Sequence, residues 1–439
     1  MPHEFWNSAI ETLGAHELER RNEALLAQQF AYVMAHSAFY QKKFANVEYI
    51  SNRTELAELP FTEKDELRVS QEEFPPFGDY LTTFPEEISR VHKTSGTTGR
   101  PLYIALTRRD IETTHECGAR AYFAAGLRAG DRVVHCLNYQ LWAGGVTDHL
   151  SLERVGATVI PFGVGNTTAL VRTIRDLQAN AISATPSYLV HLADSVRDVL
   201  HLEPRELGLR KGFFGGEPGL QNPSVREKIE QTWNLRAMDA NYGMADVLSI
   251  FGAECEVRDG LHFHGQGALL VELLDPATLQ PIEIKTGARG ELVYTNLTRQ
   301  AQPLVRYRSR DAAEIVSAEP CDCGRTGFRF RVLGRSDDMV VVRGVNVFPA
   351  AIAQILAEMP QELGGEFQIV LDAPPPYNEL PLRAEILLHV QEHEFAALRE
   401  KIFQALQQRL NFRAAIEFVP QGTLPRTEDK TSRVIKNYI

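Results

Sequence analysis

The stretch Thr94-Ser95-Gly96-Thr97-Thr98-Gly99 combines four hydroxyl side chains with two glycines. Glycine lets the backbone curl so that successive N–H groups can point at one anion, and the hydroxyls add further donors. A polyphosphate needs such a density of hydrogen-bond donors. The stretch lacks the GxxxxGK[ST] spacing of a Walker A loop. Taken alone, it predicts either a phosphate-binding loop or a flexible Ser/Thr/Gly turn.

A pair of cysteines with one residue between them indicates metal chemistry in a second part of the chain. Cys321 and Cys323 lie on a turn, and Cys255 and His262 precede them. Together they form a Cys₃His set, which is the composition of a closed structural zinc site. Four protein ligands leave no coordination position for a substrate, so zinc would hold the subdomain together. His264 is a rival ligand, because residues two apart on a strand face the same side; reduced thiols without metal are the other alternative.

The bulk composition excludes several classes of protein. The chain has 439 residues, of which 44% are hydrophobic and 23% charged, as in folded globular proteins of two or three domains. Its net charge of −11 argues against a general nucleic-acid binder. The N-terminal residues lack the apolar core of a signal peptide, and no apolar run is long enough to cross a membrane. With five sparse cysteines, the expected location is the reducing cytoplasm.

Three patterns along the chain predict the elements that must position these residues. Residues 1–50 have helical spacing. Residues 90–250 alternate strands and helices, which predicts a parallel sheet covered by helices; the expected strands are 133–137, 158–161, 181–184 and 212–214, and the expected helices include 167–178 and 188–200. Thr62 is expected to cap a short helix that begins near Lys64.

The remaining chain changes character twice. Residues 260–335 contain short strands separated by Gly, Asn and Pro, which suggests an antiparallel region: 261–263, 269–274, 290–295 and 328–333. After Gly334 a small α+β unit follows, large enough for a core of its own, with expected strands 339–342, 366–371, 382–390 and 415–419 and expected helices 349–359 and 392–410.

Four further motifs follow the hydroxyl-rich stretch in order. They are Asn241-Tyr242-Gly243-Met244-Ala245-Asp246, Arg306-Tyr307-Arg308-Ser309-Arg310-Asp311, Gly334-Arg335-Ser336-Asp337-Asp338-Met339 and Leu424-Pro425-Arg426-Thr427-Glu428-Asp429-Lys430. As a set, the five motifs resemble those of the adenylate-forming superfamily of acyl-CoA synthetases, adenylation domains and luciferases. The chain is most similar to the phenylacetate–CoA ligase branch, on account of Leu59-Pro60-Phe61-Thr62, PLVRYRSRD and GRSDDMVVVRGVNVFP.

The resemblance implies an α/β fold and a reaction. A large N-terminal adenylation domain, residues 1–335, would contain sheets covered by helices plus a β-rich subdomain, with the acid and ATP sites. A small mobile α+β domain, residues 336–439, would carry the catalytic lysine. The implied reaction joins a carboxylic acid to ATP as an acyl-adenylate and then passes the acyl group to coenzyme A, releasing pyrophosphate and AMP. The implied cofactors and co-substrates are ATP, Mg²⁺, coenzyme A and structural Zn²⁺.

The resemblance also assigns catalytic roles in and beside the small domain. Lys430 would bridge the acid's carboxylate and the α-phosphate, where a point charge stabilises the transition state; a solvated surface lysine is the alternative. Asp337 would be the hinge about which the small domain turns between the two half-reactions. Gly344 would line the channel for the pantetheine thiol. For Asp337 and Gly344 the alternative is a plain turn.

For the nucleotide, the resemblance implies contacts from several segments. Asp311 would accept both ribose hydroxyls, or else pair with Arg308 or Arg310, and Arg335 would fix the nucleotide. Asp246 would bind Mg²⁺ directly or, since it is shorter than the glutamate common in the family, through water. Tyr242 would stack near adenine, and the remaining contacts would come from Thr94, Ser95, Gly96, Thr97, Thr98, Gly99, Gly216, Glu217, Pro218, Asn241 and Gly243.

The acid pocket departs from the phenylacetate pattern. By resemblance, Trp142 lies beside the carboxylate, and the walls comprise Leu137, Tyr139, Ala143, Gly144, Pro186, Gly215 and Gly243. Where phenylacetate enzymes tend to have YGYGLF, this chain has Leu137-Asn138-Tyr139-Gln140-Leu141-Trp142. The departure puts phenylacetate itself in doubt, although flat apolar walls still favour an aromatic acid.

Three functions therefore compete. An aryl acid–CoA ligase comes first, and an enzyme that loads an aryl acid onto a carrier protein's phosphopantetheine is the first alternative. A catalytically inactive nucleotide-binding relative is the second, and the retention of Lys430, Asp311 and Arg335 argues against it. Small carboxylic acids, ATP and coenzyme A are the expected partners, with a homodimer left open and neither nucleic acid nor membrane expected. Some members of the branch carry a zinc site whose segments resemble those around Cys255, His262, Cys321 and Cys323.

Overall fold

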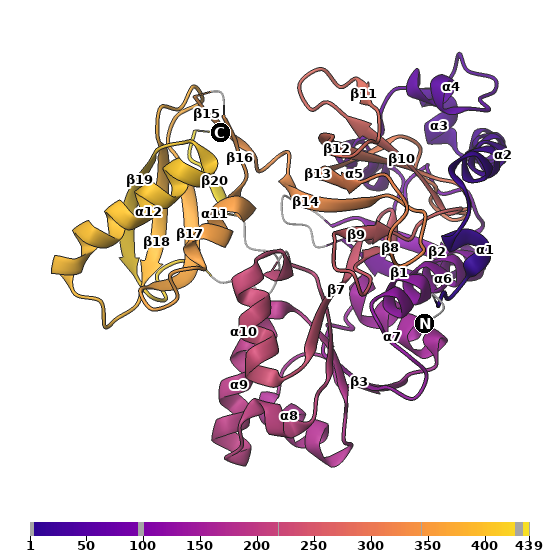
Figure 1. Ribbon diagram of the computed structural model, residues 1–439. Coiled ribbons are helices and arrows are strands. Elements are labelled where there is room, and N and C mark those ends of the chain that lie inside the picture. Colours follow the sequence, from indigo (N-terminus) through magenta and orange to yellow (C-terminus); the bar gives the residue numbers. More distant parts are fainter. Residues whose placement is uncertain (1–3, 95–100, 218, 344, 426–432, 439) are drawn as a thin grey trace. The chain divides into compact units, whose positions relative to one another are not determined.

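The computed structural model describes residues 4–94, 101–217, 219–343, 345–425 and 433–438. The chain divides into two compact units (Figure 1): the larger is Met1–Ser309 with Glu314–Arg331, and the smaller is Arg310–Ala313 with Val332–Ile439. The predicted domain boundary between residues 335 and 336 stays a prediction. The predictions for Ser95, Gly96, Thr97, Thr98, Gly99, Pro218, Gly344 and Lys430 concern residues outside the described part.

The predicted parallel sheet is confirmed in the larger unit. Five strands run parallel in the order β4-β3-β5-β6-β7: β3 Arg132–His135, β4 Thr158–Pro161, β5 Ala181–Ala184, β6 Lys211–Gly215 and β7 Arg236–Met244. Helices connect them: α7 Ala143–Val155, α8 Thr167–Asp176, α9 Pro186–Leu200 and α10 Pro223–Trp233.

Apolar side chains cover both faces of this sheet. Alternate residues of β3 point to opposite sides, and Val133 joins a core with α7 and α6 (Arg108–Ala124), whereas Val134 joins a core with α8, α9 and α10. A parallel strand buried on both faces reads as a continuous small apolar run, which is why Ala181–Ala184 was recognisable as a strand. The helices therefore cover the sheet on both sides (Figure 1).

The antiparallel region continues the same sheet beyond β7. Within the described residues the sheet has twelve strands, in the order β11-β10-β12-β13-β14-β9-β8-β7-β6-β5-β3-β4. The added strands are β8 Leu248–Ala253, β9 Leu261–Phe263, β10 Leu269–Leu274, β11 Pro281–Ile282, β12 Arg289–Asn296, β13 Tyr307–Ser317 and β14 Arg329–Arg335. Pairing changes from parallel to antiparallel between β7 and β8. The Asn241–Asp246 motif, which begins on β7, therefore lies where the parallel and antiparallel parts of the sheet meet.

The N-terminal segment is helical, as expected, and a hairpin follows it. The helices are α1 Ser8–Glu11, α2 Ala15–His36, α3 Ala38–Lys43, α4 Arg53–Ala57 and α5 Lys64–Glu73. Strands β1 (Ile88–Lys93) and β2 (Tyr103–Thr107) form an antiparallel pair, and the hydroxyl-rich stretch lies between them in the sequence. Short 3₁₀ helices complete the chain at η1 Pro85–Glu87, η2 Pro204–Leu207, η3 Gly219–Gln221 and η4 Glu392–Glu394.

The smaller unit is the predicted α+β fold. A four-stranded sheet, in the order β19-β18-β17-β20, buries Phe367 and Leu382 against Ile402 and Leu406 of α12. The bounds are β15 Val340–Val342, β16 Val345–Val347, α11 Pro349–Leu356, β17 Leu363–Leu371, β18 Leu380–Ile386, α12 Phe395–Leu410, β19 Ala414–Pro420 and β20 Val434–Lys436.

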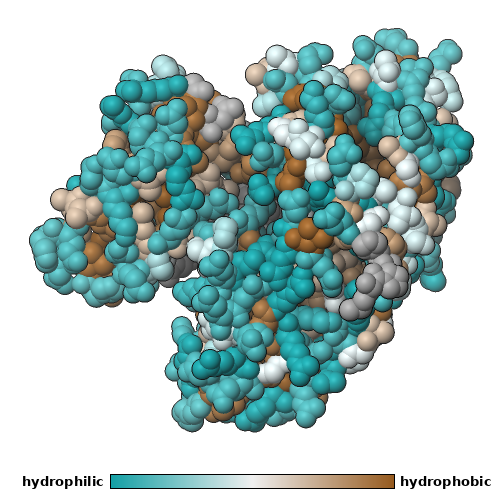
Figure 2. All heavy atoms as spheres, viewed as in Figure 1, coloured by the Kyte–Doolittle hydropathy of each residue, from teal (hydrophilic) through white to brown (hydrophobic). Residues whose placement is uncertain are grey.

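Hydrophilic residues cover most of the face drawn in Figure 2, with apolar residues scattered among them. Among the described residues, no helix is long and apolar enough to cross a membrane. The large apolar side chains are instead buried in the cores of the two units.

Candidate active site and metal centre

The carboxyl ends of β3, β5 and β6 bring together several residues of the predicted acid pocket. Because parallel strands end at one edge of a sheet, the loops that follow them meet there. A Cβ on Gly216 would lie 3.5 Å from Cη2 of Trp142 and 3.6 Å from Cγ2 of Thr185. A Cβ on Gly144 would lie 3.4 Å from Cζ3 of the same indole and 3.7 Å from Cδ1 of Leu137. The Trp142 ring thus lies between Gly144 and Gly216, with Leu137 beside it.

The neighbouring residues of the predicted pocket have firm local anchors. Ala143 and Pro186 are buried in the first turns of α7 and α9. The Tyr139 hydroxyl is 2.9 Å from Nδ1 of His149, and its ring faces Gly163, where a Cβ would lie 3.5 Å from Cδ2. Burial, the largest influence, raises the pKa of the Tyr139 hydroxyl. Tyr139 is therefore a neutral polar group next to the segment that ends at Trp142.

Two glycines of the pocket are required by close backbone packing. A Cβ on Gly215 would meet the backbone oxygen of Asn241 at 2.5 Å, and a Cβ on Gly243 would meet the oxygen of Ser249 at 1.9 Å. Neither contact is tolerable for a side chain. The expectation that Gly243 leaves room for a substrate stays a prediction, but β8 already gives a reason for glycine there.

Asn241 is held by a buried carboxyl group that the sequence did not single out. Its Nδ2 donates to Oδ2 of Asp148 on α7, which also accepts from the Tyr122 hydroxyl at 3.0 Å. Asp148 is fully buried, and burial raises the pKa of its carboxyl well above the usual value. The helix that begins beside Trp142 therefore also fixes the first residue of the Asn241–Asp246 motif.

Tyr242 lies in an aromatic cluster. Its ring packs edge-on against Phe251 at 5.2 Å and Phe330 at 5.3 Å between centroids, and its hydroxyl is 3.2 Å from that of Tyr294. These contacts fix the ring's orientation. The predicted stacking of Tyr242 near adenine stays a prediction.

Asp246 is almost completely buried and is paired with a lysine. Its Oδ2 accepts from the Tyr307 hydroxyl at 2.6 Å and lies 3.2 Å from Nζ of Lys64 at the start of α5. Burial opposes ionisation, but Lys64 and Tyr307 together outweigh it and hold the pKa of Asp246 below its usual value. A charged carboxylate is the form that Mg²⁺ needs. Lys64 was missed by sequence reasoning, although its place in the Phe61-Thr62-Glu63-Lys64 segment was the available signal.

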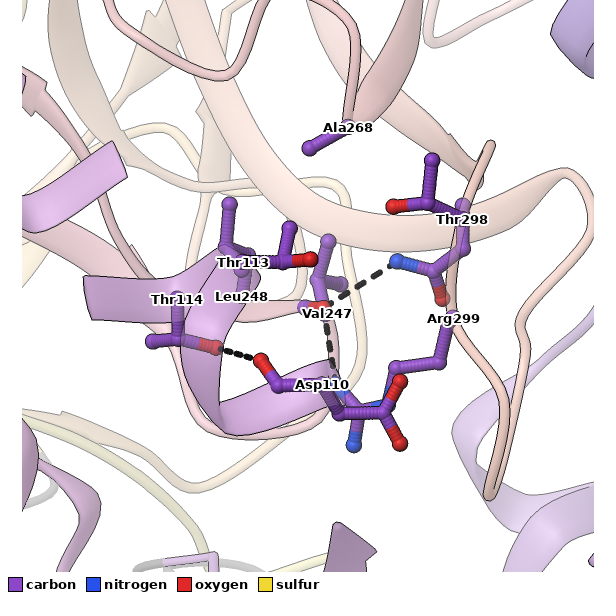
Figure 3. A pocket seen from close by; sticks show the side chains of 9 residues that line it. Asp110, Thr113, Thr114, Val247, Leu248, Ala268, Thr298 and Arg299 are labelled. Atoms are coloured by element: carbon purple, nitrogen blue, oxygen red, sulfur yellow. Dashed lines mark hydrogen bonds between the residues drawn. The ribbon is translucent and has the colours of Figure 1, made fainter. Parts of the chain in front are cut away.

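A small pocket lies beside Val247, the residue that follows Asp246 (Figure 3). It has a volume of about 10 Å³, which is room for about one water molecule, and Asp110 and Arg299 are its charged residues. Arg299 donates to the Val247 oxygen at 3.1 Å, and Asp110 accepts from the backbone N–H groups of Gln300 and Ala301. Burial lowers the pKa of the Arg299 guanidinium. The hydrogen bond from Arg299 therefore holds Val247, the residue after Asp246, in place. The pocket is too small for a substrate.

Three predicted residues meet in the smaller unit. Arg335 donates to both carboxylate oxygens of Asp337, at 2.9 and 2.7 Å, and lies 3.5 Å from Oδ1 of Asp311. Burial alone would lower the pKa of Arg335, but the carboxylates of Asp337, Asp311 and Asp338 together raise it above its usual value. Asp311 thus has a cationic neighbour at the predicted hinge, while Arg308 pairs with Glu291 at 2.8 Å.

Hydrogen bonds join the described ends of the predicted phosphate loop. Thr94 is buried, its N–H donates to the Leu102 oxygen at 3.0 Å, and its Oγ1 accepts from the Leu102 N–H at 3.0 Å. The Lys93 N–H donates to the Leu141 oxygen at 2.9 Å. The base of the loop is therefore closed and is attached to the segment that contains Trp142.

The four predicted metal ligands converge on one point. The ligand atoms of Cys255, His262, Cys321 and Cys323 all lie within 4.8 Å of one another. The Cys255 and Cys321 sulfurs are 3.8 Å apart, and the Cys323 sulfur is 3.6 Å from Nε2 of His262. A tetrahedral site with Zn–S bonds of about 2.3 Å has S···S edges of about 3.8 Å. Both the chemistry and the spacing of these donors fit zinc, and His264 is not among the converging residues.

Comparison with known proteins finds relatives that match nearly the whole chain. Residues 29–297 match the family profile described as AMP-binding enzyme, and residues 344–437 match that of the AMP-binding enzyme C-terminal domain. The chain is 32% identical to a phenylacetate–coenzyme A ligase of Pseudomonas putida, over 97% of this chain and 94% of that one. It is 33% identical to the corresponding ligase of Thermus thermophilus, over 97% and 98%.

Solved structures agree with these relatives. A 2-hydroxyisobutyryl-CoA ligase in the postadenylation state, in complex with R3-HIB-AMP, is similar with a TM-score of 0.86 and 32% identity, covering 100% of this chain and 94% of that one. The same ligase with 2-HIB-AMP and CoA in the thioesterification state gives a TM-score of 0.71 at 32% identity, covering 99% and 92%. The chain therefore has the adenylate-forming fold, belongs to the AMP-binding enzyme family and is similar to its phenylacetate–CoA ligases.

Proposed function

We propose that this protein activates a carboxylic acid with ATP and transfers the acyl group to coenzyme A. The observation that carries the proposal is the meeting of Leu137, Trp142, Gly144 and Gly216 at the carboxyl ends of β3, β5 and β6. This edge of a parallel sheet is where α/β proteins bind their ligands. The end-to-end similarity to acid–CoA ligases supports the same reaction.

The first half-reaction joins two anions, so the site must neutralise charge where they meet. In this proposal the acid's carboxylate lies beside Trp142, and its oxygen attacks the α-phosphate of ATP while pyrophosphate leaves. Lys430 bridges the two reacting groups, Asp311 accepts the ribose hydroxyls, and Arg335 holds Asp311 and Asp337 in place. Asp246 is the residue that would hold Mg²⁺, which supplies positive charge to the phosphate oxygens.

The second half-reaction uses the same acyl-adenylate. The thiol of coenzyme A enters past Gly344, its sulfur attacks the acyl carbon, and AMP leaves with the bonding electrons of the acyl–oxygen bond. Asp337 is the proposed hinge for the change between half-reactions, because its bidentate pair with Arg335 fixes one backbone conformation at that point. The 2-hydroxyisobutyryl-CoA ligase complexes with 2-HIB-AMP and CoA support the order of these steps.

An aromatic acid is the proposed substrate class. The indole of Trp142 provides a flat apolar wall, and Leu137 extends it. The relatives include ligases named for phenylacetate and for a small hydroxy acid, so a substrate panel must contain both kinds. Phenylacetate, benzoate, hydroxybenzoates and 2-hydroxyisobutyrate would each be measured by ATP–pyrophosphate exchange.

We also propose that Cys255, His262, Cys321 and Cys323 bind one structural zinc ion. The short spacing of their donor atoms supports this, and all four come from the larger unit. Metal analysis of the purified protein should find about one zinc per chain, and combined replacement of Cys321 and Cys323 by Ser should remove it. Purified protein with no bound metal would contradict the zinc assignment without affecting the ligase assignment.

One experiment tests the ligase function directly. Acid-dependent exchange of labelled pyrophosphate into ATP should occur without coenzyme A, and acyl-CoA should form when coenzyme A is added. Exchange followed by transfer only to a phosphopantetheinylated carrier protein would replace coenzyme A by that carrier as acceptor. Absence of exchange with every acid in the panel would refute acid activation.

A further inference from the structure

Glu217 joins two segments that belong to different predicted subsites. The residue follows β6 in the turn Gly215-Gly216-Glu217, and Ser187 lies in the first turn of α9. Oε1 of Glu217 accepts the Ser187 N–H at 2.5 Å, and Oε2 accepts the Ser187 hydroxyl at 3.0 Å. Both carboxylate oxygens therefore bind the same residue, at a helix terminus whose dipole favours a negative charge.

The contacts around this pair make one packed junction. Thr185 caps α9, and its methyl group and the Trp142 indole both lie against Gly216. Pro186, between Thr185 and Ser187, is buried at the first helical position, where its ring fixes the backbone. A displacement of the Glu217 turn would therefore be transmitted to Trp142 and to the start of α9.

The predicted nucleotide contact of this turn does not need the Glu217 side chain. ATP carries its charge as phosphate anions, which a carboxylate would repel. The turn can still contact a nucleotide through its backbone, and Gly216 has a φ of +80°, a conformation that favours glycine. The side chain is thus free to bind α9 while the backbone of the turn meets the nucleotide.

We propose that Glu217 is a positioning residue that ties the nucleotide turn after β6 to the acid-pocket segment at the start of α9. The inference rests on the proposed function, because it takes the acid and nucleotide subsites from there. Its consequence is that acid and nucleotide binding are linked: a ligand that fixes one side of the Glu217–Ser187 pair orders the other side.

Kinetics of Glu217→Ala, Ser187→Ala and the double variant test this role. The assay is ATP–pyrophosphate exchange with the acid of the panel that wild type uses best. Glu217→Ala should raise the KM for the acid about tenfold or more, because it removes both charge-assisted hydrogen bonds, and Ser187→Ala should raise it less, because the bond from the Ser187 N–H remains. The double variant should be no worse than Glu217→Ala, because removal of the carboxylate already removes its bonds to both the Ser187 N–H and the Ser187 hydroxyl. Glu217→Gln keeps one acceptor oxygen and should lie between wild type and Glu217→Ala.

Controls separate positioning from general damage. Ser195→Ala, on the same helix α9, should leave the KM for the acid unchanged, and the melting temperature of Ser187→Ala should stay near that of wild type. In wild type, a non-hydrolysable ATP analogue should tighten acid binding in calorimetry, and this linkage should be lost in Glu217→Ala and weakened in Ser187→Ala, which keeps the backbone N–H bond.

Four results would overturn the inference. Glu217→Ala could raise the KM for ATP alone while Ser187→Ala has no effect, which would make the carboxylate a nucleotide ligand. The effects of the two substitutions could instead multiply in the double variant, which would make them independent. Active wild type with unaffected variants would refute positioning only, whereas wild type without exchange would refute the proposed function and this inference together.

Discussion

At the scale of single residues, the most informative side chains are polar groups whose partners lie far away in the sequence. Asp148 and Glu11 have no motif around them, and Lys64 lies just after the Leu59–Thr62 motif. Each is defined by a partner elsewhere in the fold, which is Asn241 for Asp148, Asp246 for Lys64 and Arg325 for Glu11. Sequence reasoning found Asn241 and Asp246 because they belong to a motif. It could not find the residues that hold them, because tertiary contacts between distant positions leave no local pattern.

Lys64 should matter more to stability than other lysines of its neighbourhood. Lys64→Gln would leave the buried Asp246 without its cation, and unpaired buried charges typically cost about 3–5 kcal/mol. Since Lys64 is itself partly exposed, a loss of about 1–3 kcal/mol in the free energy of unfolding is expected. Denaturant titration at pH 7 measures this loss.

Lys43 provides the matched control. It pairs at 2.5 Å with Glu66, whose side chain is 41% exposed, so Lys43→Gln should cost less than about 1 kcal/mol. Equal losses for Lys43→Gln and Lys64→Gln would show that the burial of Asp246 has no special consequence. If Asp246 also holds Mg²⁺, Lys64→Gln should in addition raise the Mg²⁺ concentration needed for pyrophosphate exchange.

Asp239 on β7 should make stability depend on pH near neutrality. Burial and the neighbouring Glu254 raise the pKa of this carboxyl to about 7, against the opposing effect of Arg226. The unfolded chain loses the proton near pH 4, whereas the folded protein keeps it until about pH 7. Stability therefore falls as the pH rises from about 4 to 7 and is level above that range.

Asp239→Asn should remove this dependence. The variant should be more stable than wild type by about 4 kcal/mol at pH 8, since every pH unit between the unfolded and folded pKa values corresponds to about 1.4 kcal/mol, and the difference should vanish below about pH 4. Urea titrations between pH 4 and 8 measure the difference. Parallel stability curves for wild type and Asp239→Asn would contradict the assigned titration.

At the scale of elements, sequence patterns located strands and helices with a regular apolar pattern. They missed strands whose charged residues are buried in ion pairs with other elements. The expected strands 158–161 and 181–184 coincide with β4 and β5. All four residues of β5 are buried, whereas β4 lies at the edge of the sheet and is half-buried or exposed. Strand β13 was not predicted, because its Arg308 and Asp311 look like surface residues. In the fold the Arg308 guanidinium is buried against Glu291 of β12, which makes a charged segment acceptable inside a sheet.

The cap of α5 shows the same limit at a helix end. Thr62 was expected to cap this helix, but Glu63 occupies that position in a capping box with Glu66. The Thr62 hydroxyl donates instead to the Val305 oxygen at 2.6 Å, and Thr62 is fully buried. The Thr62 hydroxyl thus binds a carbonyl that is distant in the sequence and does not cap α5, so the prediction for Thr62 was wrong.

The proposed zinc site and the N-terminal segment are joined by hydrogen bonds and an ion pair. Arg325 follows the ligand turn, lies 3.7 Å from the Cys323 sulfur and pairs with the buried Glu11 at 2.8 Å. The Thr326 hydroxyl donates to the Leu13 oxygen at 2.6 Å. Removing the metal should therefore loosen the chain from Glu4 to Leu13 as well as the ligand turn itself.

The fluorescence of Trp6 reports this loosening. Trp6 donates to Glu116 at 3.1 Å and packs against Phe123 of α6, so release of the N-terminal segment should expose its indole to water. A strong chelator should shift the emission to longer wavelength, and Trp6→Phe should abolish that shift although Trp142 and Trp233 remain. A shift of the same size in Trp6→Phe would place the change elsewhere and contradict the coupling.

At the scale of the whole molecule, a ligase that works in two half-reactions needs one set of residues to form the acyl-adenylate and another to transfer its acyl group. Lys430 belongs to the smaller unit, and the residues around Trp142 and Gly216 belong to the larger one. If the lysine serves only adenylation, the two half-reactions can be separated by substitution. The sequence alone supports this assignment through the Leu424–Lys430 motif, because residues 426–432 lie outside the described part.

Lys430→Ala should nearly abolish acid-dependent pyrophosphate exchange and leave thioester formation from supplied acyl-adenylate close to that of wild type. In the proposed mechanism the lysine's charge stabilises the transition state in which the carboxylate attacks the α-phosphate, so a loss of about 100-fold or more is expected. Lys401→Ala is a control in the same unit, because Lys401 pairs with Glu362 on the surface of the described structure and should leave both rates unchanged. Equal losses in both half-reactions of Lys430→Ala would mean that the lysine shapes the site for both steps. A different residue would then have to act in adenylation alone. Asp337, the proposed hinge, would be the next position to substitute.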